Sequence, residues 1–437
     1  MRNRSSFALG FLALIFVGAI LLASPFAQNS GLWGDPLESA FTACSAVCVT
    51  GLTVADIAAT YTRAGQITLM VLVELGCLGL MTCGTFLLVA IGRRLSLSRE
   101  FSLMNAYGVE QVQGLRGLIF WVVGSMVFIE VAFAAALYPV FGSWYESVFY
   151  SIMSFCNAGF GLREGSLATF AGEAYPLVLM GLETILGGIG FLVIYNLCTF
   201  KFLRRSSGGR GRLSLHTHVV LRFTFYLLVL AFAAFLLIEW EGALAGSPLK
   251  DKLVIGFYQA VTPRTCGFCV IPTEDLHPLT RLIYEFLMFI GGAPGSAAAG
   301  MKVTTLAVIL YTMTAMCRGE TETVISCRVV PTEIVRESLV IFMALIMFAA
   351  LVTGALFITE AGFGFASDAL FFEAVSAITT TGLAVGDTTA QLSVAGKIVI
   401  MVAMFLGRLG ALTVVMMIGD RESKKHVRYP SEELVVG

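Results

Sequence analysis

Four short motifs centred on glycine recur along the chain, and these are the residues best suited to do chemistry. Glycine permits backbone angles that turn neighbouring carbonyl oxygens to one side, and a ring of such oxygens can replace the hydration shell of a cation. The motif glycines are 108, 108 and 115 residues apart, and a phenylalanine stands ten residues before each of them. One such glycine would fit an ordinary helix cap, but four in one register indicate a repeated site. The motifs are Val49-Thr50-Gly51-Leu52, Asn157-Ala158-Gly159-Phe160, Thr265-Cys266-Gly267-Phe268 and Thr380-Thr381-Gly382-Leu383, and the phenylalanines, which we expect to be packing anchors, are Phe41, Phe149, Phe257 and Phe372.

The composition indicates a membrane environment for these motifs. Of the 437 residues, 57% are hydrophobic and only 13% are charged, with a net charge of -1 and a mean hydropathy of +0.86. A soluble domain is roughly one quarter charged. The chain is therefore neither a soluble enzyme, nor a disordered chain, nor a secreted disulfide scaffold. No basic run is long enough to follow a phosphate backbone, so we expect no nucleic-acid partner.

Eight apolar segments are long enough to cross a bilayer, which takes about 20 residues. The first could be read as a signal peptide because it follows Arg2 and Arg4, but its apolar run is long and the repeat needs it as a span. Four shorter stretches, 36–49, 144–156, 252–264 and 368–380, each end at a glycine motif and are predicted to be re-entrant half-helices. The eight segments are 7–27, 66–92, 117–142, 174–200, 221–238, 282–317, 338–359 and 398–419.

The distribution of basic residues predicts the orientation in the membrane. Nineteen Lys and Arg residues lie before odd-numbered or after even-numbered spans, against seven on the opposite side. By the positive-inside rule both termini are cytoplasmic, and the half-helices enter from outside. We therefore predict an all-α membrane protein in which four helix–pore loop–helix repeats surround a pseudo-fourfold axis. The half-helix C-termini then face the axis, which favours cations. The repeats are expected at 1–100, 101–207, 208–325 and 326–437.

The sixth segment has 36 residues and is too long for one crossing of a hydrocarbon core of about 30 Å. Its centre, 291–300, holds Pro294 and four glycines, which break a helix. Such backbone persists in a membrane only where it is buried in protein or lines water; the alternative is a harmless kink or close helix packing. The break is the third copy of a Gly-x-x-Gly pair that follows each motif at an offset of 25 or 28 residues: Gly76/Gly79, Gly187/Gly190, Gly292/Gly295 and Gly407/Gly410.

Taken together, these motifs resemble the Trk/Ktr/HKT superfamily of potassium transporters, and most closely its bacterial KtrB-type membrane subunit. The resemblance covers residues 7–420 and includes Pro263-Arg264-Thr265-Cys266-Gly267-Phe268 and Gly407-Arg408-Leu409-Gly410. Relatives often have alanine in place of Cys266, whose side chain is expected to point away from the carbonyl ring.

The resemblance implies potassium-selective uptake across the bacterial cytoplasmic (inner) membrane. It implies a single-layer filter in which K⁺ is bound by the carbonyls of Thr50, Gly51, Ala158, Gly159, Cys266, Gly267, Thr381 and Gly382, with Val49, Asn157, Thr265 and Thr380 completing the loops. It also implies a gate beneath the filter, formed by Gly291, Gly292, Pro294, Gly295, Ser296, Gly300 and Arg408.

The resemblance further implies a homodimer in membrane lipid that binds a cytoplasmic ring of nucleotide-binding RCK subunits of the KtrA type. This chain has no Gly-x-Gly-x-x-Gly fold, so control by a nucleotide must come from a separate chain. No organic cofactor is expected. Whether sodium acts as an activator is left open by the sequence.

Two basic residues near the break have alternative interpretations. An Arg inside an apolar span is costly and is expected to face a pore or a partner. Arg408 could contact the carbonyls of the loop at 291–300 and gate the pore, or it could pair with Glu74 or Glu183, which are also intramembrane. Lys302 could gate, or extend toward the cytoplasmic surface.

Other functions are less consistent with the sequence. Cys266 and Cys269 form a single C-x-x-C pair with no second pair or clustered His, so we expect no zinc or redox site there. An intramembrane enzyme would need a catalytic pair, but no His or Asp lies in the eight apolar segments. Sodium-permeable relatives often have Ser where this chain has Gly51. A transporter with inverted repeats is disfavoured because all four units share one orientation.

Overall fold

The computed structural model describes residues 2–79, 115–163, 165–206 and 213–410, and these residues are almost entirely helical. The one regular sheet among them is a small antiparallel ribbon of β1 (Val324–Ile325) and β2 (Arg328–Val329). The main helices form four groups, and in each group a long helix comes first and two shorter helices follow. Four long helices, of 22 to 28 residues, are α1 (Arg2–Ala23), α7 (Leu115–Phe141), α11 (Leu215–Glu239) and α15 (Thr332–Thr359).

Each long helix is followed by a helix of 13 residues and then by one of 12 to 16 residues. The 13-residue helices are α2 (Pro36–Cys48), α8 (Trp144–Cys156), α12 (Leu249–Val261) and α16 (Ser367–Thr379). The third members are α4 (Arg63–Leu78), α9 (Ala174–Ile189), α13 (Pro278–Phe289) and α18 (Val394–Leu409). The remaining elements are the helices α3 (Ile57–Thr60), α10 (Phe191–Ser206), α14 (Val303–Cys317) and α17 (Thr388–Gln391) and the 3-10 turns η1 (Ala168–Phe170) and η2 (Thr273–Asp275).

Local sequence sets where several of these helices begin. Asp35 precedes α2, and its carboxylate accepts a 2.7 Å hydrogen bond from the Leu37 N–H. Pro36 occupies the first turn, where a missing N–H costs nothing. Thr62 and Ser393 cap α4 and α18 in the same way, each accepting from the N–H three residues later.

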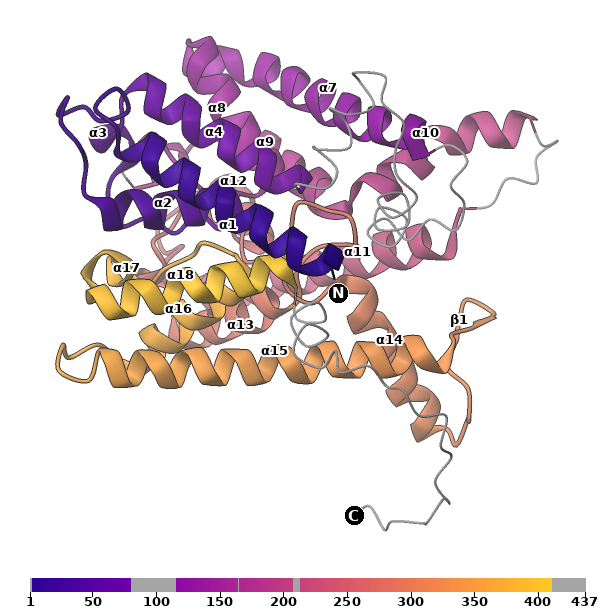
Figure 1. Cartoon of the computed structure of the whole chain (residues 1–437). Coiled ribbons are helices and arrows are strands. Elements are labelled where there is room, and N and C mark those ends of the chain that lie inside the picture. Colours follow the sequence, from indigo (N-terminus) through magenta and orange to yellow (C-terminus); the bar gives the residue numbers. More distant parts are fainter. Residues whose placement is uncertain (1, 80–114, 164, 207–212, 411–437) are drawn as a thin grey trace.

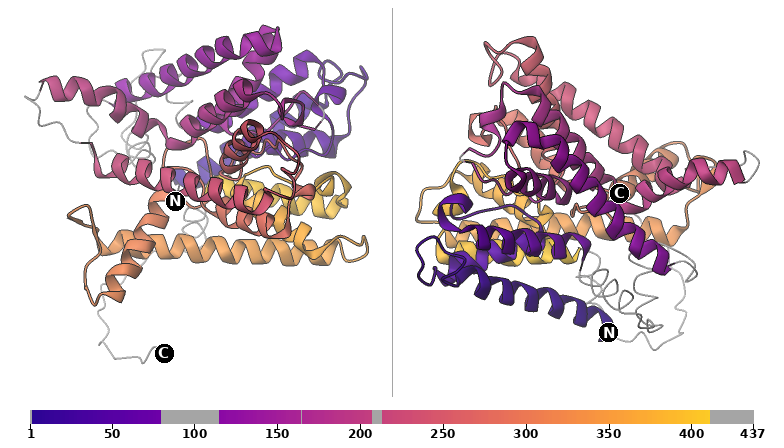
Figure 2. Two further views of the ribbon diagram at one scale, coloured as in Figure 1. Left: turned by 180° about the vertical axis from the view of Figure 1, so that it is seen from behind. Right: turned by 90° about the horizontal axis from the view of Figure 1, so that it is seen from above.

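The long helices have apolar surfaces that no other part of the described chain covers. Three of them, over Ile119–Phe141, Leu215–Glu239 and Thr332–Thr359, are long and apolar enough to cross a membrane. Phe128, Leu237 and Ile358 on these helices are 73%, 82% and 81% exposed. A helix that is hydrophobic all round yet lies at the surface fits a lipid environment. Figures 1 and 2 show α7 and α15 along opposite edges of the bundle.

Contacts between the helices close a ring. The third helix of each group packs against the 13-residue helix of the next group: α4 against α8, α9 against α12, α13 against α16, and α18 against α2. The last of these contacts joins the two ends of the sequence, and Figure 1 shows α2 and α18 side by side accordingly. The 13-residue helices therefore lie inside, and their aromatic anchors are buried: Phe41, Phe149 and Phe372 are 1% exposed or less, and Phe257 is partly buried.

The break expected in the sixth segment is present, because α13 and α14 are separate helices on either side of 291–300. The prediction of one continuous span over 174–200 is wrong. There α9 ends at Ile189, and α10 continues at an angle of 95°. The physical cause is Gly190, whose φ of 93° ends the helix. Gly79 and Gly410 end α4 and α18 in the same conformation, with φ of 72° and 83°. The later parts of 66–92 and 398–419 lie outside the described residues.

Candidate functional site

Four non-glycine residues that follow the 13-residue helices, three of them directly and Thr265 four residues after α12, have left-handed backbone conformations. Val49, Asn157, Thr265 and Thr380 have φ of 56°, 58°, 69° and 50°, and each lies two residues before a motif glycine. This region is unfavourable for β-branched residues such as Val and Thr. Strain of this kind persists only where the surrounding structure enforces it, and it concentrates at functional sites.

The motif glycines bring the four loops into contact. Gly51, Gly159, Gly267 and Gly382 have φ between 68° and 94°. A Cβ on Gly159 would lie 2.9 Å from the carbonyl oxygen of Cys266, and one on Gly267 would lie 2.7 Å from that of Thr381. A Cβ on Gly51 would collide with the Ala158 carbonyl, and one on Gly382 with the Thr50 carbonyl. Each glycine thus faces the carbonyl that precedes the glycine of the next loop, and the fourth contact returns to the first loop.

Hydrogen bonds turn the loop N–H groups back toward the helix ends. The N–H of Thr50, Ala158 and Thr381 donates to the carbonyl five residues earlier, at 2.8, 2.9 and 2.8 Å. Ser45 and Ser376 accept from the N–H of Gly51 and Gly382, each at 3.1 Å. The third loop differs, since Cys266 donates to Thr262 four residues earlier.

The carbonyls of these loops are left without partners. None of those that directly precede or belong to the motif glycines accepts a hydrogen bond within the described part of the chain. The C-terminal ends of the 13-residue helices lead into these same loops and add partial negative charge near them. Carbonyl oxygens of this kind carry no fixed charge and are groups that can replace the hydration shell of a cation. The eight residues that carry these oxygens are Thr50, Gly51, Ala158, Gly159, Cys266, Gly267, Thr381 and Gly382.

A cavity of about 420 Å³ lies over the ring. All four motif glycines line it, together with residues of the segments that follow the motifs, among them Asp56, Arg163, Cys269 and Asp387. The Cys266 side chain is fully buried, with its sulfur 3.5 Å from Thr184 Oγ1 and 3.7 Å from the Tyr258 hydroxyl. Cys266 does not line the cavity, although Cys269 does.

The loop at 291–300 is held against the bend between α9 and α10. The Ala293 N–H donates to the Gly188 carbonyl at 2.9 Å, and the Ala297 N–H donates to the Gly187 carbonyl at 3.3 Å. In return, the Phe191 N–H donates to the Gly295 carbonyl at 3.0 Å. The loop is therefore bound by the bend between α9 and α10, which the sequence did not predict.

The neck and turns of the loop are also fixed. The Gly291 N–H donates to Met301 at 2.9 Å, and the Met301 N–H donates to Phe289 at 3.0 Å, which closes the neck. Ser296 Oγ donates to the Ala293 carbonyl at 2.6 Å, across the turn that contains Pro294 and Gly295. Gly295 and Gly300 supply the left-handed turns, with φ of 69° and 73°.

Arg408 bridges the loop and the first glycine pair. Its Nη1 donates to the Ala297 carbonyl at 2.7 Å, and its Nη2 donates to the Gly76 carbonyl at 2.5 Å. Among the described residues, the ion pairs are Arg163–Glu146 and Arg281–Asp368, so Arg408 has no carboxylate partner there. The alternative pairing with Glu74 or Glu183 is not observed. Lys302 folds back onto the loop, with Nζ donating to the Ala298 carbonyl at 2.6 Å.

Sequence reasoning assigned no contact to the first glycine of each Gly-x-x-Gly pair. A Cβ on Gly76, Gly187 or Gly407 would collide with the carbonyl of a residue four positions before a motif glycine, namely Val47, Phe155 or Ile378. Gly292, the first glycine of the third pair, instead faces the Gly188 carbonyl. The recurrence of a Gly-x-x-Gly pair after every motif was the available signal.

Comparisons with known proteins show the family to which the chain is similar. The family model for TrkH, described as a cation transport protein, matches residues 11–429. The potassium/sodium uptake protein NtpJ of Enterococcus hirae is 33% identical, over 98% of this chain and 96% of that protein. The Ktr system potassium uptake protein B of Bacillus subtilis is 34% identical, over 98% and 96%. The crystal structure of the potassium transporter TrkH from Vibrio parahaemolyticus shares the fold, with a TM-score of 0.76, 17% identity, and coverage of 95% of this chain and 85% of that one.

The helical membrane fold and these matches define a multi-pass membrane transporter of ions, not an enzyme. The chain belongs to the TrkH family of cation transport proteins, and the resemblance to the Trk/Ktr superfamily drawn from its motifs is confirmed.

Proposed function

We propose that this protein takes up potassium across the bacterial cytoplasmic membrane, and that the ring of free carbonyls is its selectivity filter. The observation that carries the proposal is the closed cycle of contacts from Gly51 to Ala158, Gly159 to Cys266, Gly267 to Thr381 and Gly382 to Thr50. Dehydrated K⁺ needs several oxygen ligands, and the ring offers them without the cost of a buried fixed charge. Relatives covering nearly the whole chain are named for potassium uptake, and one also for sodium.

Each of the four loops would supply one quarter of the carbonyl oxygens of this filter. In this proposal, the chain has four pore repeats at 1–100, 101–207, 208–325 and 326–437. The C-termini of α2, α8, α12 and α16 point to one axis, which attracts cations and repels anions. The cavity of about 420 Å³ is the outer vestibule, and Arg163 and the two aspartates on its lining set the local charge.

The loop at 291–300 is proposed as the gate. Its helix-breaking residues would keep this backbone non-helical within the membrane; they are Gly291, Gly292, Pro294, Gly295 and Gly300. Hydrogen bonds with Gly187, Gly188 and Phe191 attach the loop to the bend between α9 and α10. From α18, the Arg408 guanidinium donates a hydrogen bond to the Ala297 carbonyl of the loop. In the closed state the loop and the Arg408 charge would obstruct a cation; opening requires these hydrogen bonds to break.

We further propose that both termini are cytoplasmic and that the membrane subunit is a homodimer in lipid. A Ktr-type system would add a cytoplasmic nucleotide-binding ring of the RCK, or KtrA, type that acts on the gate. The Ktr system relatives support a partner subunit. Sodium could act as an activator, or as a second transported ion, as the name of the Enterococcus hirae relative suggests.

Uptake in potassium-depleted bacterial cells that lack other importers tests the function. Cells producing this chain, with and without a co-expressed RCK-type subunit, should grow at low external potassium and accumulate it, with sodium competing weakly. No accumulation at normal membrane abundance, with and without the partner subunit, would reject the proposal.

A further inference from the structure

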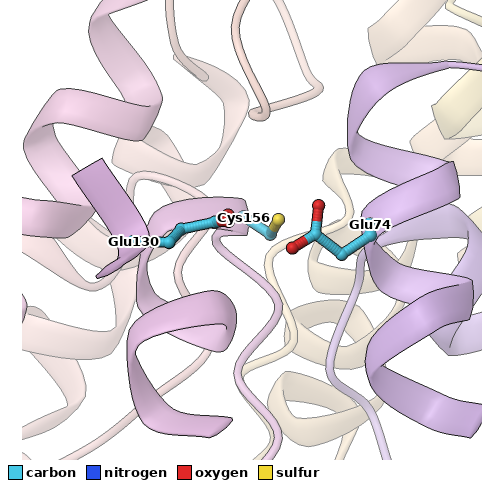
Figure 3. A group of neighbouring side chains, drawn as sticks. All are labelled: Glu74, Glu130 and Cys156. Atoms are coloured by element: carbon cyan, nitrogen blue, oxygen red, sulfur yellow. The ribbon is translucent and has the colours of Figure 1, made fainter. Parts of the chain in front are cut away.

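Three side chains that take no part in the carbonyl ring or the loop meet inside the bundle. They are Glu74 on α4, Glu130 on α7 and Cys156, the last residue of α8. One ligand atom from each, a carboxylate oxygen or the thiol sulfur, lies within 4.8 Å of those of the other two. Figure 3 shows Glu74 approaching from one side, with Glu130 and Cys156 facing it from the other.

Glu130 and Cys156 are buried and Glu74 is partly buried, and the carboxyl groups of Glu74 and Glu130 lie within hydrogen-bonding reach of each other. Glu130 is 7% exposed, and its Oε1 has no hydrogen-bond partner. Cys156 is fully buried and in no disulfide. None of the three is in an ion pair among the described residues. Burying a carboxylate without a positive partner is costly, so these carboxyl groups either hold protons or bind a cation that the described residues do not supply.

The nearby carboxyl group of Glu183 increases the need for a positive group at this place. Glu183 is fully buried, and its charge repels one on Glu130. Its Oε1 accepts from Ser151 Oγ, which also donates to the Glu130 carbonyl at 2.8 Å, while its Oε2 has no partner. Neighbouring carboxylates in a dry environment cannot all be charged unless a cation is present.

A second thiol completes the donor set. Cys77 lies three residues after Glu74 on α4, close enough to Cys156 for the two thiols to interact. Two carboxylates and one thiol, with the Cys77 thiol beside that of Cys156, form an oxygen–sulfur set. Hard cations such as Mg²⁺ and Ca²⁺ take oxygen ligands alone, whereas Zn²⁺ and similar ions accept both oxygen and sulfur.

We propose that Glu74, Glu130 and Cys156, with Cys77 beside them, bind a divalent cation of the zinc or cadmium class at a site separate from the transported ion. Ligand atoms of a tetrahedral zinc site lie about 3.3–3.8 Å apart, given metal–ligand bonds of roughly 2.0–2.3 Å. The present spacing of up to 4.8 Å therefore closes by side-chain movements of about 1 Å. The thiol that binds loses its proton on binding.

A bound ion would join α4, α7 and α8. Cys156 directly precedes Asn157, the strained residue of the second glycine motif, and Glu74 is two residues from Gly76, which accepts from Arg408. The ion would therefore lie between one loop of the carbonyl ring and the anchor of the 291–300 loop.

Cadmium binding to the purified full-length protein tests this site. The protein in detergent is stripped with a chelator and titrated with Cd²⁺, and bound metal is measured together with the ultraviolet thiolate-to-cadmium absorption. Because Cys44 and Cys48 are also buried near each other, every variant carries Cys44→Ser. We expect one Cd²⁺ per chain at this site, an affinity at least tenfold lower in Glu130→Gln, and loss of most of the absorption in Cys156→Ser.

Matched controls and a substitute variant keep the test decisive. Cys198→Ser and Glu146→Gln remove a thiol and a carboxylate that lie elsewhere, on α10 and α8, and should leave Cd²⁺ binding unchanged. Should Cys156→Ser fail to give a single peak in size-exclusion chromatography, Glu74→Gln takes its place and should likewise weaken binding tenfold. Equal Cd²⁺ affinity in Glu74→Gln, Glu130→Gln and the Cys44→Ser parent, or no binding by that parent, would overturn the assignment.

Discussion

Arg408 Nη1 donates a 2.7 Å hydrogen bond to the carbonyl oxygen of Ala297, which joins the end of α18 to the middle of the 291–300 loop. Through Nη2 the same side chain also reaches the Gly76 carbonyl on α4. Gly187 and Gly188 hold the loop from α9. Residues of the Gly-x-x-Gly region of every group of helices thus meet around the 291–300 loop.

Removing the Arg408 side chain should speed transport. Hydrogen bonds to charged groups contribute about 1.5–3 kcal/mol each, and loss of the Ala297 bond destabilises the closed loop. We expect Arg408→Ala to raise the maximal potassium uptake rate by roughly tenfold, with little change in ion preference. Initial uptake rates, divided by membrane abundance, give the measurement. Arg281→Ala, which breaks a partly buried pair with Asp368 away from the loop, is the control and should not change the rate.

The opposite outcome for Arg408 would have a distinct meaning. Normal abundance with an unchanged or lower rate would show that Arg408 does not hold a gate closed. Poor abundance, rescued by an added Glu74→Gln or Glu183→Gln, would instead favour a structural ion pair that this conformation does not contain.

Shortening the loop should also increase flux. Removing Gly295 and Ser296 deletes the carbonyl that accepts from Phe191 and the hydroxyl that donates to Ala293, while α13 and α14 stay intact. We expect faster uptake and weaker dependence on an RCK-type subunit, measured with and without that subunit. Ser296→Ala keeps the loop length and should have a much smaller effect. A folded deletion variant that conducts no faster would mean that the loop is a packing kink.

The glycines of the Gly-x-x-Gly pairs should matter for stability as well as for function. A methyl group on Gly407 would collide with the Ile378 carbonyl, so Gly407→Ala must separate α18 from α16. Overpacking of this kind typically costs about 1–3 kcal/mol. A lower midpoint of thermal unfolding in detergent is expected. Gly354→Ala is the matched control, because its added methyl group has no neighbour within 4 Å, and it should leave the midpoint unchanged or raise it.

The proposed orientation can be tested with cysteines already in the chain. Cys327, at the exposed turn between β1 and β2, should face the cytoplasm, and Cys269 lines the cavity that should face outward. In a variant that keeps only Cys327, a membrane-impermeant maleimide should label inverted vesicles and not intact cells. Labelling of Cys327 in intact cells would reverse the orientation.

Much of the arrangement could be predicted because it depends on local patterns. The half-helix stretch predicted at 144–156 is α8 without change, and that at 36–49 is α2 to within one residue. Both are short apolar runs that end at a motif whose glycine register is fixed. The pairing of each motif glycine with the next carbonyl around the ring could not be predicted from local patterns, since the partners are at least 107 residues apart and Gly382 is 332 residues from Thr50.

Three other features could not be predicted from the sequence, because apolar membrane segments tolerate glycines and isolated charged residues. Residues 174–200 read as one apolar span, and nothing in Gly190 itself distinguishes a tolerated helix glycine from one that bends the chain by 95°. For Arg408, the sequence required a partner and left both the loop carbonyls and two glutamates open. Glu130 lies alone in an apolar run, and only the packing of α7 on α8 brings it to Cys156.

Ion competition in proteoliposomes tests the central claim, the carbonyl filter, most directly. Potassium uptake by the purified protein is measured against increasing sodium, in the wild type and in Gly51→Ser, Gly159→Ser, Gly267→Ser and Gly382→Ser. Gly124→Ser is the control, since no atom lies within 4 Å of a Cβ at that position. Because each added side chain displaces a ring carbonyl, we expect the potassium-over-sodium preference to fall at least severalfold in the motif variants that fold, and to be unchanged in Gly124→Ser. Wild-type preference in all four motif variants would contradict the filter assignment.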